Sequence, residues 1–183
     1  MHEVVQTFIS KIVDETIGPR FNLAKSASAG YHAMMEIERY LQQCGIEEQL
    51  VELVKLRVSQ MNGCAVCVEM HWKNLRARGE CETRLYSLDG WRNCPYYSER
   101  ERAALDWAEA VTQITNGRVP DEVYQHASDH FTEKELADLT LAVATINAWN
   151  RLAIPAMTVA GQYTPTQQSE DSDQELSQIS QKA

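Results

Sequence analysis

The amino-acid sequence predicts an all-α fold with short connections between helices. Three observations lead to this prediction. Apolar residues recur at the three-to-four-residue spacing of helices along most of the chain. Glycine and proline fall between these periodic segments, where they end helices. No segment shows the strict alternation of apolar and polar residues that a half-buried strand requires.

The first half of the chain contains four such segments. Each stops at a glycine, alone or next to a proline or an asparagine. The third has apolar residues around most of its circumference, which predicts a largely buried helix. The fourth ends in a basic turn, which suits the negative end of a helix dipole. The predicted helices cover residues 4–17, 26–41, 47–61 and 64–79.

The second half begins with a short segment at 82–88 and a turn-rich stretch at 89–95. Two capping boxes then predict helix starts, one formed by Ser98 and Glu101 and the other by Thr132 and Glu135. Between them, Pro120 opens a short helix up to about residue 126. Pro155 is expected to kink or interrupt the last helix, because proline removes a hydrogen bond of the helix. The predicted elements are residues 98–115, 120–126 and a long helix from 132.

Length and composition predict one helical domain over 1–161, followed by a polar, acidic and disordered tail over 162–183. The net charge of −9, without a stripe of Lys and Arg, argues against nucleic-acid binding. The most apolar stretch, 139–160, contains two asparagines, an arginine and a proline, so we expect a core helix and no membrane association. The first residues lack the apolar core of a signal peptide, and we expect a cytoplasmic location.

The chemistry of the chain is concentrated at Cys64, Cys67 and His71. On a helix these residues share one face, because they are three and four positions apart. Helical spacing places the two cysteine Cα atoms roughly 5–6 Å apart, within reach of a disulfide. A disulfide that closes so short a loop contributes little stability, so reversible redox chemistry is its expected use.

A cysteine must lose its proton before it attacks a substrate, and an ordinary thiol pKa of about 8.5 makes activation useful. The helix N-terminus favours a thiolate at Cys64, whereas His71 is placed to accept a proton from Cys67. Glu52, one helix earlier, is placed to orient His71 or to take the proton onward. Which sulfur attacks stays open on these grounds.

Other readings of the same residues are a pair of buried structural thiols, or a zinc site with two cysteines, a histidine and a glutamate as ligands. Cys44, Cys81 and Cys94 lack such a neighbourhood, and we expect apolar fillers or spectator thiols. Redox chemistry is the favoured interpretation of the motif, so we predict no metal and no cofactor.

Several polar and aromatic residues outside this motif have ordinary structural interpretations. The pair His126 and His130 has the spacing of metal ligands, but a helix end is expected next to it. Lys55 and Arg57 are expected on a solvated helix face. Three polar residues in the last helix suit either a substrate pocket or a subunit contact, and the four tryptophans suit packing. These are Asn147, Asn150 and Arg151, and Trp72, Trp91, Trp107 and Trp149.

From about residue 36 to 160, the chain resembles the AhpD-like alkylhydroperoxidases of the carboxymuconolactone decarboxylase family. Their signature is a glutamate, eleven residues, Cys-x-x-Cys, three residues and a histidine, which Glu52, Cys64, Cys67 and His71 match. The resemblance implies an all-helical homo-oligomer, a trimer or a hexamer. Some members have a histidine before the second cysteine, whereas this chain has Val66, so one proton-handling group is absent.

The resemblance also implies roles for the four residues. Cys67 is the peroxidatic cysteine that becomes a sulfenic acid, and Cys64 resolves it into a disulfide. Glu52 and His71 form a proton relay with water. The sequence therefore predicts a peroxidase for small peroxides that depends on an unidentified thiol or dithiol reductant. The alternatives are a lactone decarboxylase of the same superfamily and a non-enzymatic redox sensor whose disulfide changes partner binding.

Overall fold

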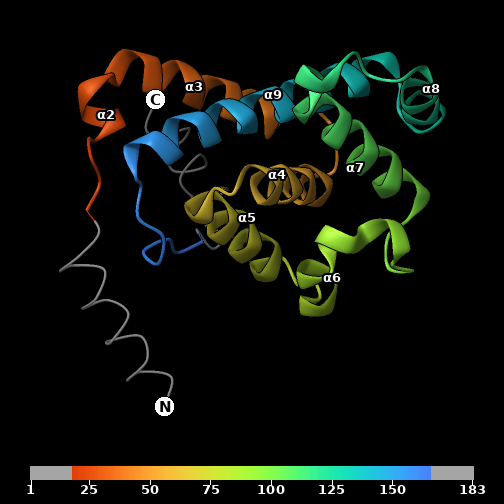
Figure 1. The fold of residues 1–183 in the computed structure, drawn as a ribbon, viewed down its shortest axis with the longest axis horizontal. Helices are drawn as coiled ribbons and strands as arrows, with labels where there is room; N and C mark the ends of the chain where they lie inside the picture. The colour runs from red at the N-terminus through yellow and green to blue at the C-terminus, as the bar shows by residue number, and fades with distance from the viewer. Residues whose placement is uncertain (1–17, 166–183) are drawn as a thin grey trace, which may run out of the picture.

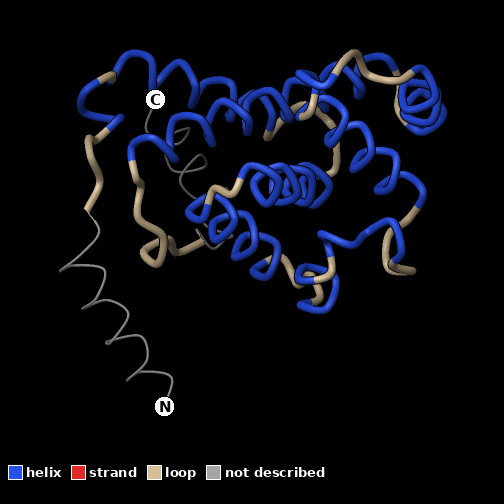
Figure 2. Tube along the Cα trace, in the orientation of Figure 1, coloured by secondary structure: helices blue, strands red, loops and turns tan. Residues whose placement is uncertain are grey.

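The computed structural model describes residues 18–165, which form helices joined by short loops and contain no strand (Figures 1 and 2). The all-α prediction is confirmed for this range. The predicted helix at 4–17 and residues 166–183 of the predicted tail lie outside it. The elements are α2 (Leu23–Ser26), α3 (Ser28–Leu41), α4 (Glu48–Asn62), α5 (Ala65–Ala77), α6 (Glu82–Tyr86), the 3₁₀ helix η1 (Leu88–Asn93), α7 (Glu99–Thr112), the 3₁₀ helix η2 (Ile114–Asn116), α8 (Asp121–His130) and α9 (Glu133–Ala156).

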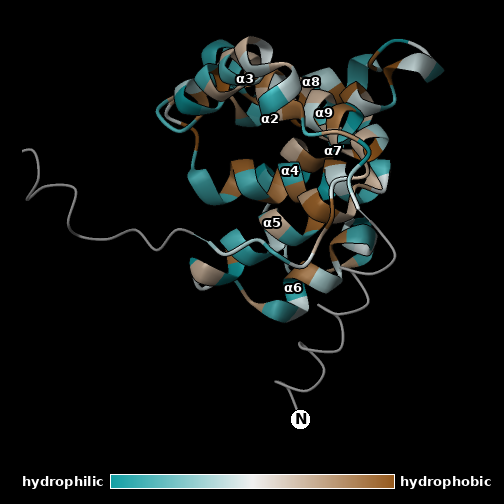
Figure 3. Cartoon of the chain, turned by 90° about the vertical axis from the view of Figure 1, so that its left-hand side faces the viewer, coloured by the Kyte–Doolittle hydropathy of each residue, from teal (hydrophilic) through white to brown (hydrophobic). Residues whose placement is uncertain are grey.

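Helix α4 lies at the centre of the domain, between α9 and α5 in the view of Figure 1. It packs against α5, α7 and α9. Val54, Leu56 and Val58 are completely buried, as the broad apolar surface of this segment predicts. In Figure 3, hydrophobic residues gather around α4, and hydrophilic residues cover the outer turns of the surrounding helices.

The central position of α4 overturns the expectation that Lys55 and Arg57 lie on a solvated face. Lys55 is only 4% exposed, and its Nζ atom donates to Glu38 at 2.5 Å. Arg57 donates to Glu109 at 2.6 Å and also pairs with Asp89. Beyond its first turn, from residue 50 to 59, α4 has no exposed residue, so charged side chains there are retained with partners of opposite charge.

The turn between α4 and α5 places the cysteine motif. Gly63 ends α4 in the left-handed conformation, with φ 71° and ψ 30°, which strains any residue with a side chain. The chain therefore reverses within two residues, and Cys64 becomes the N-cap of α5. The predicted break at Asn62-Gly63 is confirmed.

Both predicted capping boxes are present, at the start of α7 and of α9. Pro155 lies in the last turn of α9, which ends one residue later. The short helix after Pro120 extends to His130, four residues further than predicted, and stops where Phe131 is extended. In residues 18–165, no helix is long and apolar enough to cross a lipid bilayer.

Candidate active site

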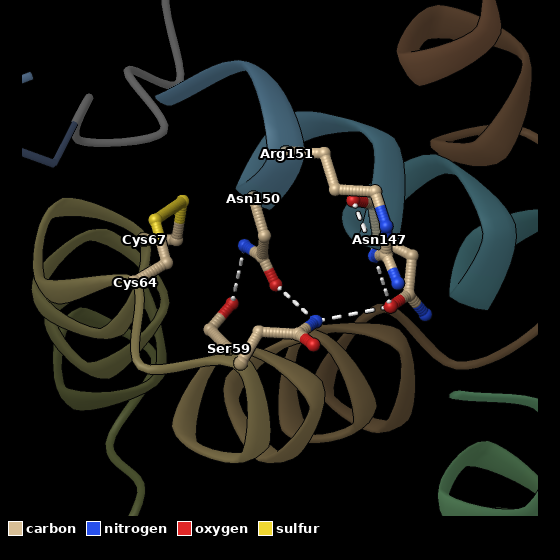
Figure 4. Close-up of a disulfide and its surroundings, with 7 residues drawn as sticks. Ser59, Cys64, Cys67, Asn147, Asn150 and Arg151 are labelled. Carbon is tan, nitrogen blue, oxygen red and sulfur yellow. Dashed lines mark hydrogen bonds between the residues drawn. A yellow bond between two sulfur atoms is a disulfide. The ribbon is translucent and has the colours of Figure 1, made fainter. Parts of the chain in front are cut away.

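Cys64 and Cys67 form a disulfide at the N-terminus of α5, with Cα atoms 5.4 Å apart (Figure 4). This separation lies in the range predicted from helical spacing. Cys64 and Cys67 are 1% and 5% exposed. The bond joins the N-cap to the first turn of the same helix, so it links no distant parts of the chain.

A cavity of about 740 Å³ lies beside the disulfide, and one of the two cysteines lines it. Its walls come from residues 19–24, α3, α4, α5, α9 and the segment 158–163. Cys67, His71 and Glu52 line it, whereas Cys64 does not. Cys67 is therefore the cysteine whose side chain a small molecule in the cavity would meet.

Glu52 and His71 are in direct contact, although they belong to different helices. His71 Nδ1 lies 2.9 Å from Glu52 Oε2, and both side chains are largely buried. A carboxylate accepts hydrogen bonds, so Nδ1 carries the proton and Nε2 is left as the basic nitrogen. Nε2 is buried and has no hydrogen-bond partner among the described residues. The predicted Glu52–His71 pairing is thus present, with a free proton acceptor.

The surroundings of Glu52 keep it ionised. Burial alone would raise the pKa of this carboxyl group. The hydrogen bond and charge of His71, the charge of Lys55 and the hydrogen bond from Asn74 outweigh burial and hold the Glu52 pKa below its ordinary value. The carboxylate is therefore available to stabilise positive charge on His71 at neutral pH.

Sequence reasoning missed two residues that extend the Glu52–His71 pair. Asn74 Nδ2 donates to Glu52 Oε2 at 3.1 Å, and the Tyr163 hydroxyl donates to Asn74 Oδ1 at 2.7 Å. Asn74 lies three positions after His71 on α5, a spacing that could have identified it. Tyr163 belongs to the segment assigned to the tail, and no sequence signal pointed to it.

The cavity also contains a polar cluster that the sequence did not suggest. Glu38 on α3 accepts from Lys55 and, at 2.9 Å, from the indole nitrogen of Trp149 on α9. Tyr31 contacts the Trp149 ring edge-on, with ring centroids 5.5 Å apart. All four residues line the cavity. Trp149 therefore has more than the packing role expected for the tryptophans.

Much of the remaining wall is apolar. Residues from α2, α3, α5, α9 and the segments before α2 and after α9 contribute it. The cavity thus combines a cysteine and a histidine–carboxylate pair with a surface that suits a hydrocarbon group. The apolar residues are Phe21, Leu23, Met35, Val66, Met70, Leu152, Ala153 and Val159.

Beside the disulfide, an amide network joins α9 to the end of α4 (Figure 4). Asn62 Nδ2 donates to Asn150 Oδ1 at 2.8 Å and to Asn147 Oδ1 at 3.0 Å. Asn150 Nδ2 donates to Ser59 at 3.3 Å, and Asn150 is completely buried. Neither Asn147, Asn150 nor Arg151 lines this cavity. Their described contacts position the turn that carries Cys64.

Replacing Asn150 by leucine is expected to lower the free energy of unfolding by about 2 kcal/mol, because buried polar groups of Ser59 and Asn62 lose a partner. Urea unfolding, monitored by circular dichroism, measures the change. Gln125, an exposed amide on α8, supplies the matched control: Gln125→Leu should change stability by less than about 0.5 kcal/mol. Equal effects of the two substitutions would contradict a structural role for the network.

The remaining candidate residues lie apart from this site. The His126 and His130 rings contact each other with centroids 5.4 Å apart on α8. No group of three or more His, Cys, Asp or Glu side chains in the described part of the chain is arranged to hold a metal ion. Cys44 is buried, Cys81 is exposed and Cys94 is half-buried, all three as free thiols.

Comparisons with known proteins identify the family of the chain. The family model for the carboxymuconolactone decarboxylase family matches residues 28–110, which include all four motif residues. The uncharacterised protein YdfG of Bacillus subtilis is 44% identical over 135 residues, covering 74% of this chain and 92% of YdfG.

Solved structures show the same fold. A protein of unknown function from Agrobacterium tumefaciens, described as a candidate AhpD antioxidant defence protein, matches with 38% identity and a TM-score of 0.76 over 78% of this chain and 98% of its own. A peroxidase-related protein from Ralstonia eutropha with an alkylhydroperoxidase AhpD core matches with 19% identity and a TM-score of 0.65, over 89% and 92% of the two chains. With its helical fold, its Cys-x-x-Cys turn and these relatives, the chain belongs to the carboxymuconolactone decarboxylase family and is AhpD-like.

Proposed function

We propose that this protein is a thiol-dependent peroxidase that reduces small peroxides through Cys67 and Cys64. The observation that carries the proposal is the contact between Glu52 and His71 on the wall of the cavity that Cys67 lines. A redox-active sulfur, a histidine with a free basic nitrogen and an ionised carboxylate are the groups that peroxide reduction needs. The description of the Agrobacterium relative as an antioxidant defence protein supports the same activity.

In the first step, His71 Nε2 accepts the proton of the Cys67 thiol, directly or through water. The Cys67 thiolate then attacks the terminal oxygen of the hydroperoxide, and the O–O bond breaks. His71 returns the proton to the departing alkoxide, which leaves as an alcohol, and Cys67 becomes a sulfenic acid. Glu52 stabilises the positive charge that His71 carries between these events.

In the second step, the sulfur of Cys64 attacks the Cys67 sulfenic acid, water leaves, and the disulfide forms. The structure has this disulfide, which is the oxidised end of the proposed cycle. An external thiol or dithiol supplies the two electrons and two protons that restore both cysteines. Val66 lines the cavity at the position where some relatives carry a histidine, and its side chain has no proton to exchange. We therefore assign all proton transfer to His71.

The apolar wall of the cavity favours an organic hydroperoxide over hydrogen peroxide as the better substrate. We further propose that the protein acts in the cytoplasm as a homo-oligomer, a trimer or a hexamer. The family to which the chain belongs supports the homo-oligomer. A cysteine pair whose cycle needs a reducing environment supports the cytoplasmic location.

The test measures consumption of cumene hydroperoxide by the reduced protein in the presence of dithiothreitol. We expect many turnovers per chain, with one dithiol oxidised per peroxide, and a Cys64–Cys67 disulfide in the peptide map after the dithiol is exhausted. One disulfide per chain without further turnover would instead indicate a redox sensor. Lactone decarboxylation that survives removal of both cysteines would support the decarboxylase alternative.

A further inference from the structure

The proton-handling pair is connected to the segment that follows α9. Residues 158–163 lie along α5, and Thr158, Val159, Gln162 and Tyr163 form part of the cavity wall. Two polar contacts fix this segment: the backbone N–H of Gly161 donates to Glu69, and Lys73 Nζ donates to the backbone oxygen of Tyr163 at 2.7 Å. The Tyr163 side chain is thereby held beside the last turns of α5.

From this position, a continuous series of hydrogen bonds leads to the reactive site. The Tyr163 hydroxyl donates to Asn74 Oδ1 at 2.7 Å, Asn74 Nδ2 donates to Glu52 Oε2 at 3.1 Å, and His71 Nδ1 donates to the same oxygen at 2.9 Å. Because the Glu52 carboxylate can only accept, Asn74 must present its NH₂ group to Glu52, and the amide oxygen is then left to accept from the Tyr163 hydroxyl.

The orientation of Asn74 matters because Glu52 has a competing partner. Lys55, on the same helix one turn later, is buried and close enough for its charge to act on Glu52. Without the Asn74 donor, the Glu52 carboxylate is free to turn from His71 toward this ammonium group. A flipped Asn74 would also place its oxygen against the carboxylate, and two acceptors repel each other. The carboxylate excludes that orientation, and the Tyr163 hydroxyl holds the amide in place by donating to its oxygen.

We propose that Asn74 and Tyr163 are positioning residues for the Glu52–His71 pair: Tyr163 holds the Asn74 amide in place, and Asn74 holds the Glu52 carboxylate against His71. This inference rests on the proposed thiol chemistry and adds two residues to it. Neither residue is assigned a reaction with peroxide. Their effect reaches Cys67 through Glu52 and His71.

The titratable and charged groups around Glu52 come from each element that faces it. Glu38 projects from α3, Lys55 from α4, His71 from α5 and Tyr163 from the segment after α9, and all line the cavity. The substitutions Asn74→Leu and Tyr163→Phe remove none of the charged side chains around Glu52. A change in the pH dependence of Cys67 therefore reports the position of Glu52, and a purely structural role would not produce it.

The experiment measures the rate at which iodoacetamide alkylates Cys67 in the reduced full-length protein as a function of pH. Peptide mass spectrometry quantifies alkylation at each cysteine, so the readout does not need peroxide turnover. We expect the midpoint of the Cys67 profile to move to higher pH in both variants, with alkylation near pH 7 about tenfold slower in Asn74→Leu and about threefold slower in Tyr163→Phe.

The double variant tests the order of the two residues. If Tyr163 acts through Asn74, the change Tyr163→Phe has no further effect once Asn74 is leucine. Tyr40→Phe is the matched control, because the Tyr40 hydroxyl also donates to a side chain at 2.7 Å, that of Asp138, away from the cavity. The Tyr40→Phe protein should have the same pH profile of Cys67 alkylation as the wild-type protein.

Unshifted Cys67 profiles in folded Asn74→Leu and Tyr163→Phe would overturn the inference, as would additive effects in the double variant. If Asn74→Leu does not fold, the Tyr163→Phe profile alone decides. Peroxide turnover, measured in parallel, separates the two proposals. Shifted alkylation in a protein without turnover would reject the peroxidase function and retain the positioning roles.

Discussion

Replacement of Cys67 by serine is expected to abolish peroxide turnover, with a loss of at least about a thousandfold. The reason is geometric, since Cys67 is the cysteine of the pair that lines the cavity with His71. A serine hydroxyl at that position neither attacks a peroxide nor forms a disulfide. Steady-state consumption of cumene hydroperoxide with excess dithiothreitol measures the effect.

The variant Cys64→Ser separates the roles of the two sulfurs. Cys67 should still reduce the first peroxide and then accumulate as a sulfenic acid, which a dimedone adduct detects by mass spectrometry. The exposed Cys81 provides the control, and Cys81→Ser should have normal turnover. A sulfenic acid on Cys64 in the Cys67→Ser protein, with retained turnover, would reverse the assignment.

The core of the candidate site could be predicted because local geometry determines it. On a helix, the spacing of Cys64, Cys67 and His71 places the three residues on one face. In the structure the two cysteines form a disulfide, and Cys67 and His71 line the same cavity. Glu52 was predicted from its place on the preceding helix and from the family signature. Gly63, between the two helices, makes the reversal that brings Glu52 and His71 together.

The outer parts of the site could not be predicted, because they depend on contacts between distant segments. Tyr163 and Asn74 are 89 positions apart, and Glu38 and Trp149 are 111 positions apart. Periodicity shows which face of a helix is apolar, but not which polar group from another element meets it. For the same reason the pattern placed Lys55 on a solvated face, although α3 supplies a carboxylate that pairs with it inside the domain.

The same limit affected the polar residues of α9. Asn147 and Asn150 interrupt an apolar helix, and the sequence offered a pocket or a subunit contact as explanations. The structure shows partners within the chain, at the end of α4 and on α7. A buried asparagine needs partners of some kind, and only the packing of helices identifies them.

Replacing Glu52 by glutamine is expected to lower peroxide turnover about a hundredfold, because the neutral amide cannot stabilise a positively charged His71. The Glu52 pKa is held below its ordinary value of 4.5. The carboxylate is therefore charged across about pH 5 to 8, and the loss should be similar over that whole range. Turnover at several pH values, with Glu36→Gln as an exposed control, measures it.

The pKa shift of Glu52 also fixes the sign of its effect on stability. A carboxyl group whose pKa is lower in the folded state stabilises that state above pH 4.5, and the stabilisation disappears as the pH falls through the lowered value. Urea unfolding of the wild-type protein and Glu52→Gln should therefore differ most near neutral pH and converge in acid. A constant difference at all pH values would contradict the lowered Glu52 pKa. Full turnover in Glu52→Gln would mean that the Glu52–His71 contact is only structural and that His71 acts on Cys67 without a carboxylate partner.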